Sequence, residues 1–254
     1  CKCAFFAVPL YEKKYTTKNM TVVVASDSFK GSLSSTEVAT AAARGIKSVY
    51  PDCEAVAVSV ADGGEGTVEA VVKALDGEMV SAVVSDPLGR AVQAHYGIAG
   101  GMAIIEMAAA SGLPLLSAKE RNPWLTSTHG TGEMIMDAIG RGCRDFLIGI
   151  GGSATNDAGS GMLQAMGFRF YDIHGEEIRD CCGGRLGDIR RIDDSGVTEG
   201  VRQSIFTVAC DVDTPFCGRE GAAYVFAPQK GADAGMIARL DAGMASLAKV
   251  IEEK

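Results

Sequence analysis

From residue 20 onward, short runs of β-branched and small apolar residues alternate with amphipathic stretches. The runs 21–26 (TVVVAS) and 55–61 (AVAVSVA) predict buried strands, and the stretch 35–50 between them predicts a helix. Two parallel strands joined by a helix form a βαβ unit, whose handedness and burial favour a doubly wound sheet. The alternation therefore predicts an α/β fold.

The pattern changes near residue 86. DPLGR at 86–90 predicts a turn, and 91–98 and 102–107 predict antiparallel strands around a Gly-Gly turn. Further along, we expect strands at 146–150, 168–171, 205–212 and 222–226. Helices are expected over most of 124–139, after a glycine-rich loop up to Met166, and at the end of the chain over 233–253.

These elements predict two α/β domains, one inserted into the other. The first is a parallel-sheet domain that starts at 20–85, with strands at 21–26, 55–61 and 79–84. A second, mixed α/β domain at 86–230 interrupts it, and 231–254 begins the return. Residues 1–19 look foreign to the rest of the chain. In a βα pattern a further strand would follow the terminal helix, and the first domain has only three predicted strands, few for an open sheet. We therefore predict that 20–254 is a truncated and inactive piece.

Charge and composition exclude several classes of protein. The 24 Lys and Arg against 32 Asp and Glu give a net charge of −8 without a long basic run, which excludes a phosphate-tracking nucleic-acid binder. The apolar stretches are shorter than the ~18 residues that cross a bilayer, so no membrane span is expected. The eight cysteines form no CxxC pair, which favours reduced thiols over a disulfide framework. The chain is therefore expected to be cytoplasmic.

Small or acidic residues follow four of the predicted strands. In open α/β sheets, ligands collect outside the carboxyl ends of strands, so these corners are candidate sites. The segments are SDSFKGS (26–32), ADGGEGT (61–67), GIGGSATNDAGSG (149–161) and CDVDTPFCG (210–218).

The first two corners carry opposite charges. Lys30, in a segment with Asp27, is suited to neutralise a phosphate. Taken alone, however, this segment is better explained by a surface lysine and a capping aspartate. Asp62 and Glu65 flank the glycines at 63–64 and could hold Mg²⁺, which favours one or two carboxylates plus substrate phosphates. Ordinary turn chemistry is the alternative there.

The third corner is the richest. Gly149, Gly151 and Gly152, with Ser153 and Thr155, give a backbone that can approach an anion closely. The same segment also fits the dinucleotide-binding fingerprint, with Asp172 about twenty residues further on. That fit would indicate a nicotinamide-dependent oxidoreductase. Asp157 argues against that alternative, because a carboxylate there would repel a docked pyrophosphate.

The fourth corner supplies a candidate general base. Asp211 stands at the end of the apolar run 205–212 and could accept a proton from a substrate hydroxyl, unless it is simply solvated. Lys230, in APQKGA (227–232), is either a second phosphate contact or an ordinary loop lysine.

Five segments together resemble a known family. SDSFKGSLSS, ADGGEGT, GIGGSATNDAGSGMLQAMG, CDVDTPFCG and FAPQKGA, in this order and spacing, resemble the bacterial glycerate kinases of the two-domain glycerate 2-kinase type. The resemblance runs from Met20 to about Glu253. It implies an ATP- and Mg²⁺-dependent phosphorylation of D-glycerate, with 2-phosphoglycerate as the favoured product. It also implies that the reaction takes place between a flavodoxin-like domain and an inserted domain. The chain departs from the family at Thr214-Pro215-Phe216, where Asn-Pro-Leu is usual, and family members continue further.

With this resemblance, each candidate receives an expected role. Asp211 and Lys30 are expected to be catalytic, and Asp62 and Glu65 to bind the metal. Substrate or phosphate contacts are expected from Asp27, Ser28, Gly63, Gly64, Gly151, Gly152, Ser153, Thr155, Asn156, Asp157 and Lys230. The expected partners are ATP and D-glycerate, and a homodimer is left open. The alternatives are a remnant that binds nucleotide or glycerate without turnover, and an NAD(P)-dependent oxidoreductase.

Overall fold

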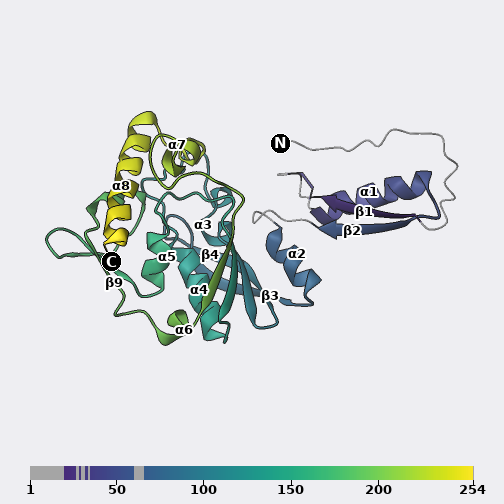
Figure 1. Cartoon of the computed structure of the whole chain (residues 1–254), viewed down its shortest axis with the longest axis horizontal. Coiled ribbons are helices and arrows are strands. Elements are labelled where there is room, and N and C mark those ends of the chain that lie inside the picture. The colour runs from purple at the N-terminus through teal and green to yellow at the C-terminus, as the bar shows by residue number, and fades with distance from the viewer. Residues whose placement is uncertain (1–19, 27–28, 30–31, 34, 60–65, 254) are drawn as a thin grey trace. The chain divides into compact units, whose positions relative to one another are not determined.

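The computed structural model describes residues 20–26, 29, 32–33, 35–59 and 66–253 (Figure 1). The chain divides into two compact units, residues 1–60 and residues 61–254. Both mix helices with strands, which confirms the predicted α/β class.

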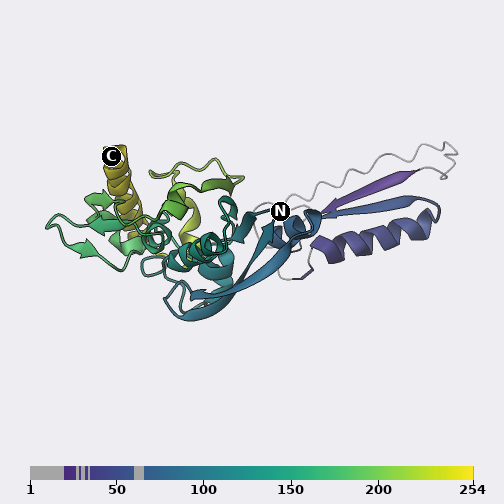
Figure 2. The same cartoon turned by 90° about the horizontal axis from the view of Figure 1, so that it is seen from below.

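The first unit is the predicted βαβ arrangement. Strand β1 (Thr21–Ser26) pairs in parallel with β2 (Glu54–Ser59), and helix α1 (Ser35–Val49) connects them. Figure 2 shows α1 running alongside the two strands. Along β1, exposed residues alternate with partly buried ones, as period-2 side chains require when one face is covered.

A five-stranded mixed sheet forms the centre of the second unit. Its order is β10-β6-β5-β4-β3, in which β5, β6 and β10 are parallel and β3 and β4 are antiparallel additions. The bounds are β3 (Glu78–Ser85), β4 (Ala91–Ala99), β5 (Met102–Glu106), β6 (Asp145–Gly149) and β10 (Ile205–Ala209). The predicted hairpin of β4 and β5 is confirmed, and Gly100 and Gly101 supply the positive φ angles of its turn.

Helices cover both faces of this sheet. In β5, Ala103 and Ile105 belong to the same core as Ile135 of α4 (His129–Gly140), whereas Ile104 packs with Val72 of α2 (Thr67–Ala74). Successive residues of a strand point to opposite faces, so an unbroken apolar run is what a strand buried on both sides needs.

Strand β3 lies elsewhere than expected. The sequence pattern predicts 79–84 in the sheet of the first domain, but β3 pairs with β4 from Glu78↔Ile98 to Ser85↔Ala91. The turn between them explains the pairing, because the buried Asp86 carboxylate accepts hydrogen bonds from the amides of Leu88 (2.8 Å) and Arg90 (2.9 Å). A domain boundary at residue 86 would cut this closed hairpin.

A second core holds the rest of the unit. The small sheet has the order β8-β7-β9. The remaining elements are α3 (Ala108–Ser111), η1 (Leu113–Leu115), α5 (Ser160–Ala165), β7 (Arg169–Tyr171), β8 (Glu177–Ile178), η2 (Gly183–Asp188), β9 (Arg191–Asp193), α6 (Glu199–Arg202), α7 (Ala222–Phe226), η3 (Pro228–Lys230) and α8 (Ala234–Glu252).

The terminal helix α8 belongs to this second core. Its residues Leu240 and Leu247 are buried in one cluster with Phe170 and Leu186. The sequence predicts that 231–254 begins the return to the first domain. In the structure, however, the apolar face of α8 packs inside the second unit.

The predicted strand at 222–226 is wrong, because α7 is helical there. Tyr, Val and Phe at 224–226 favour a strand by composition, but hydrogen bonds four residues apart join Val225 to Gly221 and Ala227 to Ala223. Ala223 and Ala227, one helical turn apart, are both fully buried in the second core. Burial of two small residues on one face therefore outweighs the strand propensity of the residues between them.

The close approach of α4 to β3 gives a stability prediction. A Cβ atom on Gly130 would overlap the Ser85 carbonyl oxygen, which belongs to backbone and cannot swing away. We expect Gly130→Ala to lower the free energy of unfolding by about 2 kcal/mol, as overpacking does. In the same helix, a Cβ atom on Gly140 would have nothing within 4 Å, so Gly140→Ala should be neutral or stabilise by up to about 1 kcal/mol. Urea denaturation of both variants measures this, and equal effects would contradict it.

Candidate functional site

The carboxyl ends of three parallel strands meet at one edge of the five-stranded sheet. Gly149, the last residue of β6, is in register with Glu106 of β5 and with Ala209 of β10. The segments that follow these residues include two of the predicted corners, 149–161 and 210–218. This is the edge at which open α/β sheets bind ligands.

The loop after β6 is fixed by backbone pairing. Leu113 donates its amide to the Gly152 carbonyl (3.0 Å), and Ala154 donates its own to the Ser111 carbonyl (2.8 Å). The buried hydroxyl of Thr126 donates to the Ala154 carbonyl (2.8 Å). The loop is therefore ordered by neighbours that are distant in sequence.

Lys230 lies inside the protein, against this loop. The residue is 7% exposed, and its Nζ donates to Ser153 Oγ (2.7 Å) and to the Thr155 carbonyl oxygen (2.5 Å). Gly231 follows in the left-handed region (φ 98°), where a Cβ would overlap the Arg121 carbonyl. Burial lowers the pKa of Lys230 to about 8, and the negative charge of Asp157 partly opposes that shift.

Asp157 is buried as well, and its carboxylate is fully used within the protein. It is 1% exposed and accepts hydrogen bonds from the amide and hydroxyl of Thr128 (both 2.8 Å) and from the amides of Gly159 and Gly161 (both 3.2 Å). Burial raises the pKa of Asp157, and these four donors offset part of the rise. The carboxylate thus joins the start of α4 to the start of α5.

Asn156 is likewise engaged by its side chain. It is 8% exposed, and its Nδ2 donates to the sulfur of Met244 in α8 (3.2 Å). Its side chain therefore anchors the loop to the second core.

Three backbone amides of the loop point away from the groups that hold it. The carbonyls of residues 152, 154 and 155 accept the hydrogen bonds described above. In a planar trans peptide, the following N–H points the opposite way, which orients the amides of Ser153, Thr155 and Asn156 away from those donors. Within the described part of the chain, these amides have no hydrogen-bond acceptor. Two of them, at Thr155 and Asn156, are consecutive, and consecutive backbone amides without an internal acceptor can bind an anion.

Asp211 lies at the same sheet edge as this loop. It follows β10 by two residues, next to β6, and its side chain is exposed. The third and fourth corners therefore follow the ends of two neighbouring strands, β6 and β10.

The other predicted residues, Asp27, Ser28, Lys30, Asp62, Gly63, Gly64 and Glu65, lie outside the described residues. Helix α2, which starts at Thr67, is held near the same edge because Val68 donates its amide to Glu106 Oε1 (2.8 Å). Among the residues that the structure describes, no group of three His, Cys, Asp or Glu side chains is placed to hold a metal ion. The magnesium prediction therefore rests on Asp62 and Glu65 alone.

The sequence pattern does not single out the polar residues that support the loop. Ser111, Thr126 and Thr128 are almost fully buried and all contact the 150–162 segment. The prediction is a helix over most of 124–139, but α4 begins at His129. A signal for this later start is present in TSTHGTG at 126–132, because Ser, Thr and Gly favour caps and turns over helix interiors.

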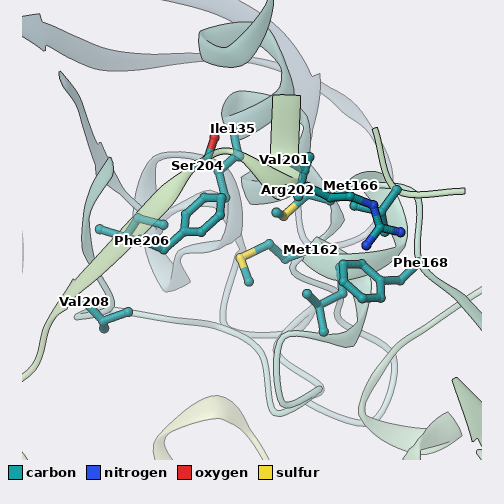
Figure 3. A pocket seen from close by; sticks show the side chains of 12 residues that line it. Ile135, Met162, Met166, Phe168, Val201, Arg202, Ser204, Phe206 and Val208 are labelled. Carbon is teal, nitrogen blue, oxygen red and sulfur yellow. The ribbon is translucent and has the colours of Figure 1, made fainter. Parts of the chain in front are cut away.

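A separate apolar hollow of about 570 Å³ lies beside β10 (Figure 3). Met162, Phe168, Phe206 and Val208 line it, and Arg202 and Ser204 are its polar residues. It contains none of the loop amides, so its chemistry does not suit a phosphate.

Two further observations concern the chain as a whole. No helix in the described ranges is long and apolar enough to cross a membrane. The six cysteines within those ranges are free thiols, as expected.

Comparison with known proteins gives a consistent result. A family model described as the glycerate kinase family matches residues 22–254. The chain is 48% identical over 236 residues to a glycerate 2-kinase of Escherichia coli K12 and to a glycerate kinase of Bacillus subtilis 168, covering 92% of this chain and 62% of each relative. A crystal structure from Salmonella typhimurium LT2, provisionally assigned as glycerate kinase 2, superposes with a TM-score of 0.82 at 46% identity, covering 92% of this chain and 63% of that one. The chain thus spans a little under two thirds of these relatives.

Proposed function

The chain belongs to the glycerate kinase family, and from this premise we propose that it transfers a phosphoryl group from ATP to D-glycerate, with 2-phosphoglycerate as the favoured product. The observation that carries the proposal is the loop at 150–159, whose amides point away from its internal supports at the carboxyl edge of the sheet. Phosphoryl transfer needs mainly positioning and charge stabilisation, and such a loop can supply both.

The proposed reaction uses groups at this edge. The amides of Ser153, Thr155 and Asn156 hold phosphate oxygens of ATP. The Asp211 carboxylate accepts the proton of the attacking glycerate hydroxyl, whose oxygen then forms a bond to the γ-phosphorus. The bond from that phosphorus to the bridging oxygen breaks, and ADP leaves.

The remaining predicted residues complete the proposal. Lys30 is assigned a catalytic role in neutralising phosphate charge. Asp27 and Ser28 are assigned to phosphate or substrate contacts, together with the glycines at 63–64 and 151–152. Asp62 and Glu65 are assigned to Mg²⁺, which when bound would neutralise phosphate charge. The interior positions of Asn156 and Asp157 leave their side chains as supports of the loop. A reducing, cytoplasmic setting agrees with the free thiols.

The oxidoreductase alternative finds little support at this site. The dinucleotide fingerprint requires a helix that opens on the glycines, but α5 begins only at Ser160. Asp172, its candidate ribose contact, instead accepts the amides of His174 (2.8 Å) and Glu176 (2.9 Å) in a local turn.

The test is an ADP-release assay with ATP, Mg²⁺ and D-glycerate, run on this chain and on a version extended to the length of its relatives. We expect ADP release that depends on D-glycerate from the extended version, and ³¹P NMR of the product identifies the phosphorylated hydroxyl. Glycerol is the matched control, because it keeps the hydroxyls and lacks the carboxylate. ATP binding without ADP release would favour the non-catalytic alternative, and binding of a nicotinamide dinucleotide in place of ATP would favour the oxidoreductase.

A further inference from the structure

Lys230 holds the loop after β6 at two points that are two residues apart. Its ammonium donates to the Ser153 side chain and to the Thr155 backbone carbonyl. The second bond fixes the peptide plane between Thr155 and Asn156, and with it the direction of the Asn156 amide. The lysine therefore acts on the orientation of the loop amides from the side opposite to a bound anion.

The surroundings of Lys230 are unsuited to direct phosphate contact. The side chain is 7% exposed, and two of the three ammonium donors already have close acceptors. The third donor remains, on a side chain with little exposed surface. The two acceptors, the Ser153 hydroxyl and the Thr155 carbonyl, belong to the loop that is assigned to the phosphate.

A buried carboxylate also acts on Lys230. The negative charge of Asp157 partly opposes the lowering of the Lys230 pKa by burial. Asp157 is itself held by four hydrogen bonds from Thr128, Gly159 and Gly161. The contacts that place the Lys230 ammonium are therefore those with Ser153 and Thr155.

We propose that Lys230 is a positioning residue that fixes the 151–157 loop for anion binding and does not itself contact the phosphate. This inference rests on the proposed function for the identity of the anion, and on the structure alone for the fixing of the loop. It assigns to Lys230 a role different from the phosphate contact expected from the sequence.

The first test uses the ligand-free chain and needs no activity. Lys230→Met keeps the length of the side chain and removes both hydrogen bonds. We expect amide exchange at Ala154 and Leu113, whose hydrogen bonds tie the loop to the 111–113 segment, to become at least about 10-fold faster. Lys249→Met, on an exposed position of α8, is the matched control and should leave both amides unchanged. Unchanged exchange in Lys230→Met would overturn the proposal.

Ser153→Ala keeps the test decisive if Lys230→Met does not fold. It removes one of the two acceptors and leaves the charge of Lys230 in place. Exchange at Ala154 should then rise above the Lys249→Met control. No rise above that control would mean that the contact with Lys230 does not fix the loop, and it would overturn the proposal.

The second test separates positioning from direct contact. With ATP as the probe, Lys230→Met should raise the Kd by about 10-fold, and a crystal structure of the wild-type protein with ATP should keep Lys230 Nζ bonded to Ser153 Oγ and the Thr155 carbonyl. A phosphate oxygen within hydrogen-bond distance of Nζ would show direct contact and overturn the proposal, as would a Kd within twofold of the wild-type value. If wild-type protein binds no ATP, the proposed function fails, whereas the amide-exchange result still decides whether Lys230 fixes the loop.

Discussion

We expect Asp211→Asn, made in a version of the chain extended to the length of its relatives, to lower the kcat of D-glycerate phosphorylation by about 100-fold or more, the range for a lost general base. The amide keeps the size of the side chain but cannot accept the hydroxyl proton. Since Asp211 is exposed and lies beyond the end of β10, its replacement should leave the Tm almost unchanged. The ADP-release assay measures kcat, and a thermal melt measures stability.

Asp213 provides the matched control, because it is another exposed aspartate in the same segment. Asp213→Asn should change kcat by no more than a few-fold. If Asp211→Asn also retains activity within a few-fold, the general base lies elsewhere, and Asp62 is the next candidate.

Periodicity and turn chemistry are enough to predict much of the fold. The parallel pair β1 and β2 follows from two β-branched runs separated by a helical stretch, and the β4–β5 hairpin follows from Gly-Gly between two apolar runs. The carboxyl-edge position of the loop after β6 also follows from the order of elements. In each case the signal is local, since it depends on residues near one another in the chain.

The elements whose place in the fold differs from the prediction are positioned by contacts between residues far apart in the sequence. A local sequence pattern does not reveal such contacts. Helix α8 has an apolar face that could pack on either domain, and only the presence of Phe170 and Leu186 in the same core assigns it to the second unit. Lys230 illustrates the same limit at the site. A lysine between Gln and Gly is typical of a surface loop, and only its contacts with Ser153 and Thr155, some 75 residues away, place it in the interior.

Asp157→Ala is expected to lower the free energy of unfolding by about 3–5 kcal/mol, the range for breaking a buried charged network. The substitution removes the acceptor of four hydrogen bonds at once, two from Thr128 and one each from Gly159 and Gly161. Each buried donor left without a partner costs about 1–3 kcal/mol, partly recovered if water enters the space.

The control for this prediction is Asp172→Ala. The Asp172 carboxylate also accepts two backbone amides, from His174 and Glu176, but in an exposed turn where water replaces the lost acceptor. Its cost should stay below about 1 kcal/mol, as for substitutions away from buried networks. Urea denaturation of the two variants gives the comparison directly. Similar losses in both would mean that Asp157 does not join α4 to α5 as a buried acceptor, and the loop that it supports would then need another source of order.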